Sequence, residues 1–552
     1  MYRFPKSIFF ILSAIFILSC SREIKPRVES KDGLYLFLDT LEQRYEVACS
    51  EMELTRWNSV TKEAPPDFIS TREMLAQIFL DTSVRNIISE WRGRSGSLAD
   101  KPLARRLELW HRAFIGGSIE YDDEIISAKI NLVQKYSRIK INVNGEELSG
   151  EEILGLLQTE KKSKKRKIYW QAYIQENSKY FDEYRKTVQL LNTKALAKGF
   201  PNYYSLVLYL NGIDEGKLLN TFEILKEIVS PPKEKPSSNS KRKHKSNKTN
   251  APWDVEYYSQ MAKQLPEKYF RADSLIATMN RYFDSTGFSP DSIRILSRAK
   301  NNQITDDCFR VAIPKDIRIT FPLLSGQQNY ANVFAIYAHG LKAAFTRVDF
   351  PILKSYTIVP GTFSPVYDDG IARMMHDLLF DSLWLRTFTK VKEKELRQFY
   401  SKRNEPQVVK LIQEMKNFET EYEFFKNPIL NTDSLERSMI EKYYDIRIDS
   451  GTSTPFEINP MFVAKPGTFY KTIVTKLIAA QLEEALFNKF GARKHTDSLV
   501  AIWMIDHLFS SGEKIEWQER MRNATGKSVD PGPFLRKIGI EHSTLLSNNN
   551  LK

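Results

Sequence analysis

The chain has 552 residues, of which 42% are apolar, so it can build a large buried core. Its formal net charge is +13, but residues 231–250 hold seven Lys or Arg and one Glu. The basic character therefore belongs largely to one segment and does not indicate a nucleic-acid-binding protein. Only three cysteines are present, which excludes a zinc site built on four thiolates.

The first twenty residues indicate a targeting signal rather than part of the fold. The run "MYRFPKSIFFILSAIFILSC" starts with basic residues, continues with a short apolar stretch and ends at Cys20. It resembles the lipobox of bacterial lipoproteins, in which the signal peptide is cut before a cysteine that carries lipid. We therefore expect a signal peptide at 1–19 and a lipidated tether at 20–33. A plain secretory signal and an N-terminal anchor helix are the alternatives.

This signal predicts a location in the bacterial cell envelope. No other run is long and apolar enough to cross a membrane, so the lipid on Cys20 would be the membrane anchor. Ser21 is compatible with sorting to the periplasmic face of the outer membrane. A disulfide between Cys49 and Cys308 is permitted there, but their separation does not predict one.

From residue 34 onward, the apolar spacing predicts a mainly helical chain. Ser149 is expected to be the N-cap of one of these helices. The charge run Lys161–Lys167 is interpreted as a solvated turn and helix face, with a nucleic-acid or anionic-lipid patch as the alternative. Residues 231–250 lack apolar side chains and are expected to form a disordered basic insertion.

Only one region has the pattern of β structure. Residues Asp306–Leu324 mix β-branched and aromatic side chains around Pro314, which predicts a short hairpin. This hairpin lies just before the apolar helical run "VFAIYAHGLKAAF", Val333–Phe345.

Several motifs between residues 50 and 540 stand in the same order as in one known family. They include "LLNTKALAKGFPNYYSLVL", "APWDVEYY", "CFRVAIPKDIRI" and "LFSSGEKIEWQERMRNATGKSVDPGPFL". The set resembles the angiotensin-converting-enzyme-like peptidyl-dipeptidases and, more distantly, the thimet-type oligopeptidases, which are gluzincin zinc peptidases. The resemblance implies a mainly α, two-lobed body around a deep central channel, formed by one domain over 34–552.

The resemblance also places the zinc helix at Val333–Phe345. Such a helix carries two histidines one turn apart and, between them, a glutamate that activates the zinc-bound water. Here the first histidine position is Tyr337, the glutamate position is Ala338 and the second histidine position is Leu341. The residues that the resemblance implies would bind zinc and activate its water are therefore replaced.

The other positions implied by the resemblance are also changed. Asp368 or Asp369 stands near the third zinc ligand, a glutamate in the family. The two positions that stabilise the developing oxyanion correspond to Phe462 and Thr472, with Tyr470 out of register.

These replacements imply a catalytically inactive relative, a pseudopeptidase, that holds no metal and binds peptides or a protein partner. The candidate residues for its peptide channel are Phe309, Val311, Ala312, Tyr337, His339 and Tyr470.

Two other interpretations stay open. One is an active zinc metallopeptidase with an atypical site, for example one built from His339, His376 and Asp368. The other is a purely structural envelope lipoprotein whose channel is filled by bulky residues such as Leu341 and Phe462. The sequence does not indicate the oligomeric state.

Overall fold

The computed structural model describes residues 28–97, 100–229, 251–259, 264–299, 304–447 and 465–540. The predicted signal peptide, Cys20, the basic insertion and Phe462 lie outside these ranges. Within them, no helix combines the length and the apolar character needed to cross a membrane.

The first helix, α1 (Lys31–Thr61), begins at a well-formed cap. The Ser30 side chain accepts a hydrogen bond from the Gly33 amide at 3.0 Å. Leu34, Leu38 and Leu41 follow at helical spacing and are buried. The helix therefore starts three residues inside the range that was expected for the tether.

Helices dominate the rest of the chain, and the predicted mainly helical class is confirmed. Up to residue 229 the further helices are α2 (Phe68–Phe79), α3 (Thr82–Arg94), α4 (Lys101–Glu120), α5 (Asp123–Ser137), α6 (Gly150–Thr159), α7 (Ser163–Ser178), α8 (Phe181–Leu196), α9 (Tyr203–Leu210) and α10 (Glu215–Val229). After residue 251 they are α11 (Val255–Ser259), α12 (Leu275–Ser285), α13 (Gln327–Ala344), α14 (Pro365–Leu378), α15 (Ser382–Phe388), α16 (Glu393–Tyr400), α17 (Asn404–Lys426), α18 (Thr432–Tyr444), α20 (Phe469–Phe490), α21 (Leu499–Met504), α22 (Trp517–Thr525) and α23 (Gly532–Lys537).

The predicted hairpin is present, and it belongs to a three-stranded sheet. Strands β4 (Asp307–Ala312) and β5 (Asp316–Leu323) pair antiparallel, and β3 (Ile293–Ala299) pairs with β5 in parallel. The sheet order is β3-β5-β4, so β5 is central and its residues Ile317 and Ile319 are fully buried. Strand β3 was not predicted.

A second hairpin was also missed, because its strands are only four residues long. Strands β1 (Lys140–Val143) and β2 (Glu146–Ser149) pair antiparallel across Asn144 and Gly145, which both have positive φ. An Asn-Gly pair of this kind is typical of a tight two-residue hairpin turn. Ser149 ends β2 and caps α6 as predicted, with Glu152 completing a capping box.

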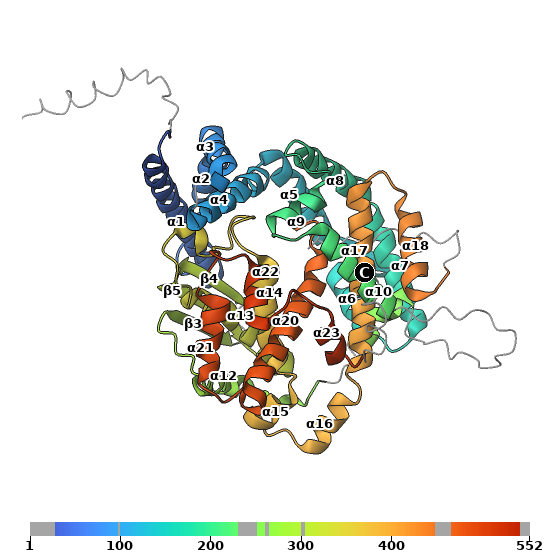
Figure 1. Ribbon diagram of the computed structural model, residues 1–552. Helices are drawn as coiled ribbons and strands as arrows, with labels where there is room; N and C mark the ends of the chain where they lie inside the picture. The colour runs from blue at the N-terminus through green and yellow to red at the C-terminus, as the bar shows by residue number, and fades with distance from the viewer. Residues whose placement is uncertain are drawn as a thin grey trace, which may run out of the picture.

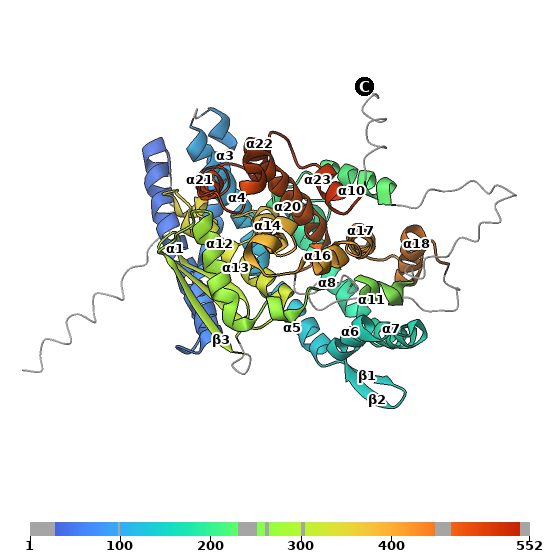
Figure 2. The ribbon, with the colours of Figure 1, turned by 90° about the horizontal axis from the view of Figure 1, so that it is seen from below.

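The elements form two halves that meet along the long helices α17 and α20 (Figures 1 and 2). One half contains the three-stranded sheet with α1, α12 and α13, and α1 forms its outer flank. The other half contains α6, α7, α11 and α18 and the β1–β2 hairpin. At the centre of the molecule, α14 packs against both α13 and α20.

The charge run Lys161–Lys167, which spans the start of α7, is only partly the solvated face that was predicted. Lys164 and Lys165 are exposed, but Arg166 is buried. Its guanidinium donates to one carboxylate oxygen of buried Asp254, at 2.8 Å from Nε and 2.5 Å from Nη2. Asp254, 88 residues further along the chain, thus holds one cation of the run in the core.

Candidate functional site

The helix α13 passes between the sheet and α14 and carries Tyr337, Ala338 and Leu341, the three positions that the sequence resemblance aligns with the zinc-binding motif. Ala338 and Leu341 are fully buried, and Tyr337 is nearly so. The Tyr337 ring lies 4.5 Å from the ring of Phe283, centroid to centroid. Burial raises the pKa of the Tyr337 hydroxyl to about 12, so it remains a neutral phenol near pH 7. These three positions therefore form apolar core.

Asp368, on α14, lies in a buried cluster of ion pairs. Its Oδ2 accepts from Arg310 Nη2 at 2.9 Å, and its Oδ1 contacts the ammonium of Lys342. All three side chains are at most 4% exposed. Burial alone would raise the pKa of Asp368, but Lys342 and Arg310 outweigh it and hold that pKa well below its ordinary value.

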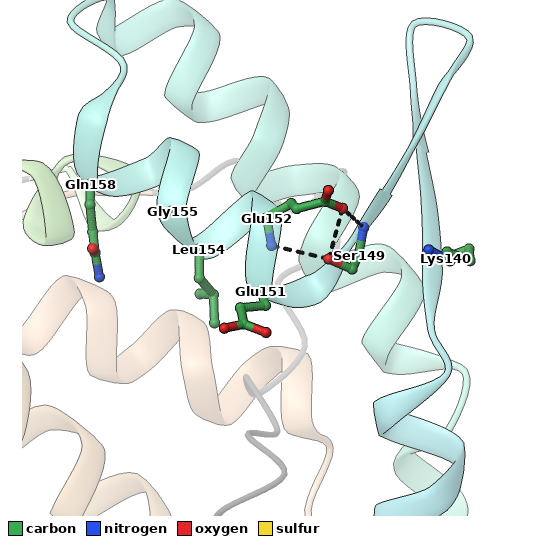
Figure 3. A pocket seen from close by; sticks show the side chains of 7 residues that line it. All are labelled: Lys140, Ser149, Glu151, Glu152, Leu154, Gly155 and Gln158. Atoms are coloured by element: carbon green, nitrogen blue, oxygen red, sulfur yellow. Dashed lines mark hydrogen bonds between the residues drawn. The ribbon is translucent and has the colours of Figure 1, made fainter. Parts of the chain in front are cut away.

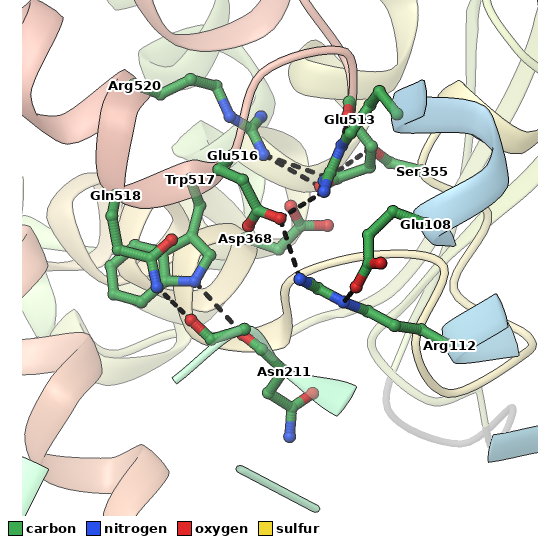
Figure 4. A network of polar contacts seen from close by, with 12 residues as sticks. Glu108, Arg112, Asn211, Ser355, Asp368, Glu513, Glu516, Trp517, Gln518 and Arg520 are labelled. Atoms are coloured by element: carbon green, nitrogen blue, oxygen red, sulfur yellow. Dashed lines mark hydrogen bonds and ion pairs between the residues drawn. The ribbon is translucent and has the colours of Figure 1, made fainter. Parts of the chain in front are cut away.

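The cluster continues toward the loop before α22. Lys342 Nζ lies 3.7 Å from Glu513 Oε1, and Glu513 accepts from Arg520 at 3.1 Å and from Ser355 Oγ at 2.8 Å. Figure 4 shows Glu513 between Arg520 and Ser355, with Asp368 nearby. In the same view Glu516 reaches Arg112 of α4, at 3.0 Å. The charges thus join β4, α13, α14, α22 and α4.

A polar face lies beside this buried cluster. His339 Nε2 is 3.7 Å from Asp369 Oδ1, and Lys471 of α20 pairs with Asp369 Oδ2 at 2.5 Å. The His339 side chain is 20% exposed, that of Asp369 is 38% exposed and that of Lys471 is 32% exposed. Further along the same two helices, Gln328 Nε2 of α13 lies 2.8 Å from His376 Nε2 of α14. We call Gln328, His339, Asp369, His376 and Lys471 the polar face.

The residues present do not fit the zinc ion that the resemblance implies. Ala338 and Leu341 have no donor atom, Tyr337 is a neutral phenol, and both oxygens of Asp368 are held by protein cations. His376 contacts Gln328 and Asp377 rather than His339 or Asp368. Within the described ranges, no group of three or more His, Cys, Asp or Glu side chains is arranged to hold a metal ion.

The remaining candidate residues are dispersed. Phe309 and Val311 form a small apolar cluster with Trp57 of α1, on the face of β4 that points away from α13. Ala312 ends β4 and is partly exposed. The buried Tyr470 hydroxyl accepts from Asn211 Nδ2 at 2.6 Å, and exposed Thr472 bonds to the Phe469 carbonyl of its own helix.

Two surface pockets lie away from all of these residues. One, of about 790 Å³, lies along α6 and β1 (Figure 3), where Ser149 and Glu152 are engaged in the capping box. The other, of about 250 Å³, lies on α1 around Leu36, Phe37 and Leu41. Cys49 and Cys308 are both buried and free.

Three solved structures of carboxypeptidases superpose on this chain over most of its length. Metallocarboxypeptidase 1 of Trypanosoma cruzi superposes with a TM-score of 0.60 at 13% identity, over 91% of this chain and 98% of that one. A carboxypeptidase from Deinococcus radiodurans gives 0.57 at 12% identity, over 91% and 97%. One from Pyrococcus furiosus gives 0.60 at 10% identity, over 93% and 99%.

The chain has the fold of these metallocarboxypeptidases. The sequence resemblance is therefore confirmed at the level of the fold. The similar structures are carboxypeptidases, however, and they do not support the narrower likeness to peptidyl-dipeptidases. No protein-family description and no curated protein sequence matches the chain.

The sequence prediction missed the residues that hold the centre together, namely Arg310, Lys342, Glu513 and Lys471. A signal for Lys342 was available, because it is a lysine within the apolar run "VFAIYAHGLKAAF", four residues after Ala338. A charged residue on the buried face of a helix needs a partner of opposite charge. The partner could not be identified from the sequence, because Asp368 comes from another helix.

Proposed function

We propose that this protein is a lipid-anchored, catalytically inactive peptidase-like protein that binds peptides or a peptide segment of a protein partner. The observation that carries the proposal is the state of the zinc-helix positions. Ala338 and Leu341 supply no ligand, and Asp368 is already paired with Lys342 and Arg310. Hydrolysis by the mechanism of zinc peptidases requires three ligands and a general base at these places.

Alanine at position 338 is the replacement with the largest expected effect on hydrolysis. In a zinc peptidase the residue at this position is the glutamate that takes the proton from the attacking water. A methyl group cannot accept a proton, and the carboxylate that α14 contributes to the cluster, Asp368, has a pKa held well below its ordinary value by Lys342 and Arg310. A group with so low a pKa is a poor general base near neutral pH.

Peptide binding is supported by the polar face. It presents a positive group, Lys471, a negative group, Asp369, and hydrogen-bonding groups on Gln328, His339 and His376. A peptide brings backbone amides, carbonyls and charged ends, which such a face can pair. The carboxypeptidase names of the similar structures and the motif resemblance to peptidyl-dipeptidases both favour a peptide ligand.

The proposal includes the lipid anchor on Cys20 and a location on the periplasmic face of the outer membrane. Its support is the lipobox-like sequence and the position of α1, which starts only eleven residues after Cys20, at Lys31. An extended tether of this length spans roughly 35 Å, so the folded domain would lie close to the membrane surface.

The experiment combines zinc analysis, a hydrolysis assay and a binding titration on the purified protein. We expect no stoichiometric zinc, no cleavage of a peptide mixture, and saturable binding of peptides measured by fluorescence anisotropy. Lys471→Ala should weaken binding about tenfold, the loss expected for one charge-assisted hydrogen bond. Lys489→Ala, an exposed lysine of the same helix, is the matched control and should bind as the wild type does.

Stoichiometric zinc together with released C-terminal residues or dipeptides would show an active peptidase instead. Absence of peptide binding, with zinc also absent, would support the purely structural lipoprotein.

A further inference from the structure

The Lys342 ammonium has the surroundings of a bound cation. It contacts Asp368 Oδ1, and it lies 3.4 Å from Ser355 Oγ and 3.7 Å from Glu513 Oε1. An ammonium group has three N–H donors, and here three oxygens from three different segments surround it. The Lys342 side chain is 2% exposed, so solvent does not screen these contacts.

The replacement at Ala338 makes room for this lysine. A helical side chain lies over the turn that precedes its own Cα, so Lys342 covers the helix surface at Ala338, four residues earlier. Ala338 and Lys342 are both buried, so a longer side chain at position 338 would compete with the lysine stem for space. A glutamate at position 338, as in a zinc peptidase, would occupy the same volume. The two positions are therefore coupled.

Cations and carboxylates alternate around Lys342. Asp368 lies between Lys342 and Arg310, and Glu513 lies between Lys342 and Arg520. Each buried carboxylate contacts cations, which is the condition under which ions are tolerated in a protein interior. A divalent cation added at Asp368 would face two fixed positive charges within contact distance of that carboxylate.

We propose that the Lys342 ammonium replaces the metal ion of this fold as the buried cation that joins α13 to Asp368 and Glu513, and that it excludes zinc from Asp368. This inference rests on the proposed function, since it explains how a centre without zinc stays folded. It assigns to Lys342 a role that zinc would have in an active relative, without any catalytic role.

The first test is a double-mutant cycle on unfolding in urea. Lys342→Met and Asp368→Asn should each lower the midpoint, because each removes one of the opposite charges that a buried ion contacts. The double variant should lose clearly less than the two losses added together. As a matched control, Lys416→Met removes another buried lysine, which pairs with Glu436; combined with Asp368→Asn it should be additive. Additive losses for Lys342 and Asp368 would overturn the inference.

The second test restores the zinc ligands. Tyr337→His, Ala338→Glu and Leu341→His are combined, with and without Lys342→Met, and zinc binding is measured by calorimetry on variants that circular dichroism shows to be folded. We expect zinc binding only when Lys342 is also replaced. Zinc binding with Lys342 in place would refute its role, whereas zinc in the wild-type protein would refute the proposed function itself. If the restored variants do not fold, the unfolding cycle decides alone.

Discussion

Several single arginine and lysine residues are buried in the described parts of the chain, and Arg106 and Arg166 each contact a carboxylate. Arg106 is fully buried, donates to Glu42 at 2.8 Å and stacks over the Phe350 ring at 3.8 Å. Arg166 makes the corresponding pair with Asp254. Removing an ion from water costs several kcal/mol, so a buried cation depends on its partner.

Arg166 and its neighbour Lys165 test this dependence within one charge run. Arg166→Ala should lower the free energy of unfolding by about 3–5 kcal/mol, because Asp254 stays buried without its partner. Lys165, with its side chain 56% exposed and its ammonium 3.9 Å from Glu160, is the matched control. Lys165→Ala should change stability by less than about 0.5 kcal/mol. Equal losses in urea unfolding would contradict the assignment of Arg166 to the core.

Among the helices, α14 and α20 pack unusually closely where they face each other at Gly370. Gly370 of α14 lies against Ile478 of α20, so a Cβ added at Gly370 would stand 2.8 Å from the Ile478 Cβ. The Ile478 Cβ is attached directly to the helix backbone and cannot rotate away. The absence of a side chain at Gly370 therefore sets how closely the two helices approach, and with them Asp369 and Lys471 of the polar face.

Gly370→Ala should consequently lower the free energy of unfolding by roughly 1–3 kcal/mol, since the added methyl forces the helices apart. Gly155 of α6 is exposed and has nothing within 4 Å of its hypothetical Cβ. Gly155→Ala should raise stability by about 0.5–1 kcal/mol through better helix propensity. Denaturant unfolding of both variants checks the pair, and a stabilised Gly370→Ala would disprove the packing argument.

The whole molecule joins its two halves through α17 and α20. Buried Glu421 of α17 accepts backbone hydrogen bonds from Gly467 at 2.9 Å and Phe469 at 3.2 Å, at the start of α20. This contact orients α20, which carries Lys471, relative to α14. At the other end of the molecule, α1 begins eleven residues after the proposed lipid attachment at Cys20, so the anchored half would be the one that contains the sheet.

The proposed lipid anchor on Cys20 can be tested in the intact protein. Cys20→Ala should abolish incorporation of a fatty-acid analogue in growing cells, because the thiol that accepts the lipid is gone. Cys49→Ala, which removes a buried free thiol, should leave the labelling unchanged. Labelling is read from the purified protein by mass spectrometry of its N-terminal peptide. A labelled Cys20→Ala protein would show that the lipid, if present, is attached elsewhere.

Local patterns predicted those parts of the fold whose signals lie close together in the sequence. The hairpin around Pro314, the cap at Ser149 and the helix over Val333–Phe345 are each set by neighbouring residues. Strand β3 was missed because it lacks a local turn partner and pairs in parallel with β5. The β1–β2 hairpin was missed because four-residue strands give a weak periodic signal.

The sequence by itself determined the mainly helical fold, because that follows from residue type and spacing. Its resemblance to zinc peptidases implied that the zinc-helix residues are replaced. Only the tertiary structure decided what took their place. Asp368, Lys342, Arg310 and Glu513 come from four separate segments, and a buried ion pair exists only where folding brings both charges together. For the same reason, the burial of Arg166 could not be predicted from its charge run, because its partner Asp254 is distant in sequence.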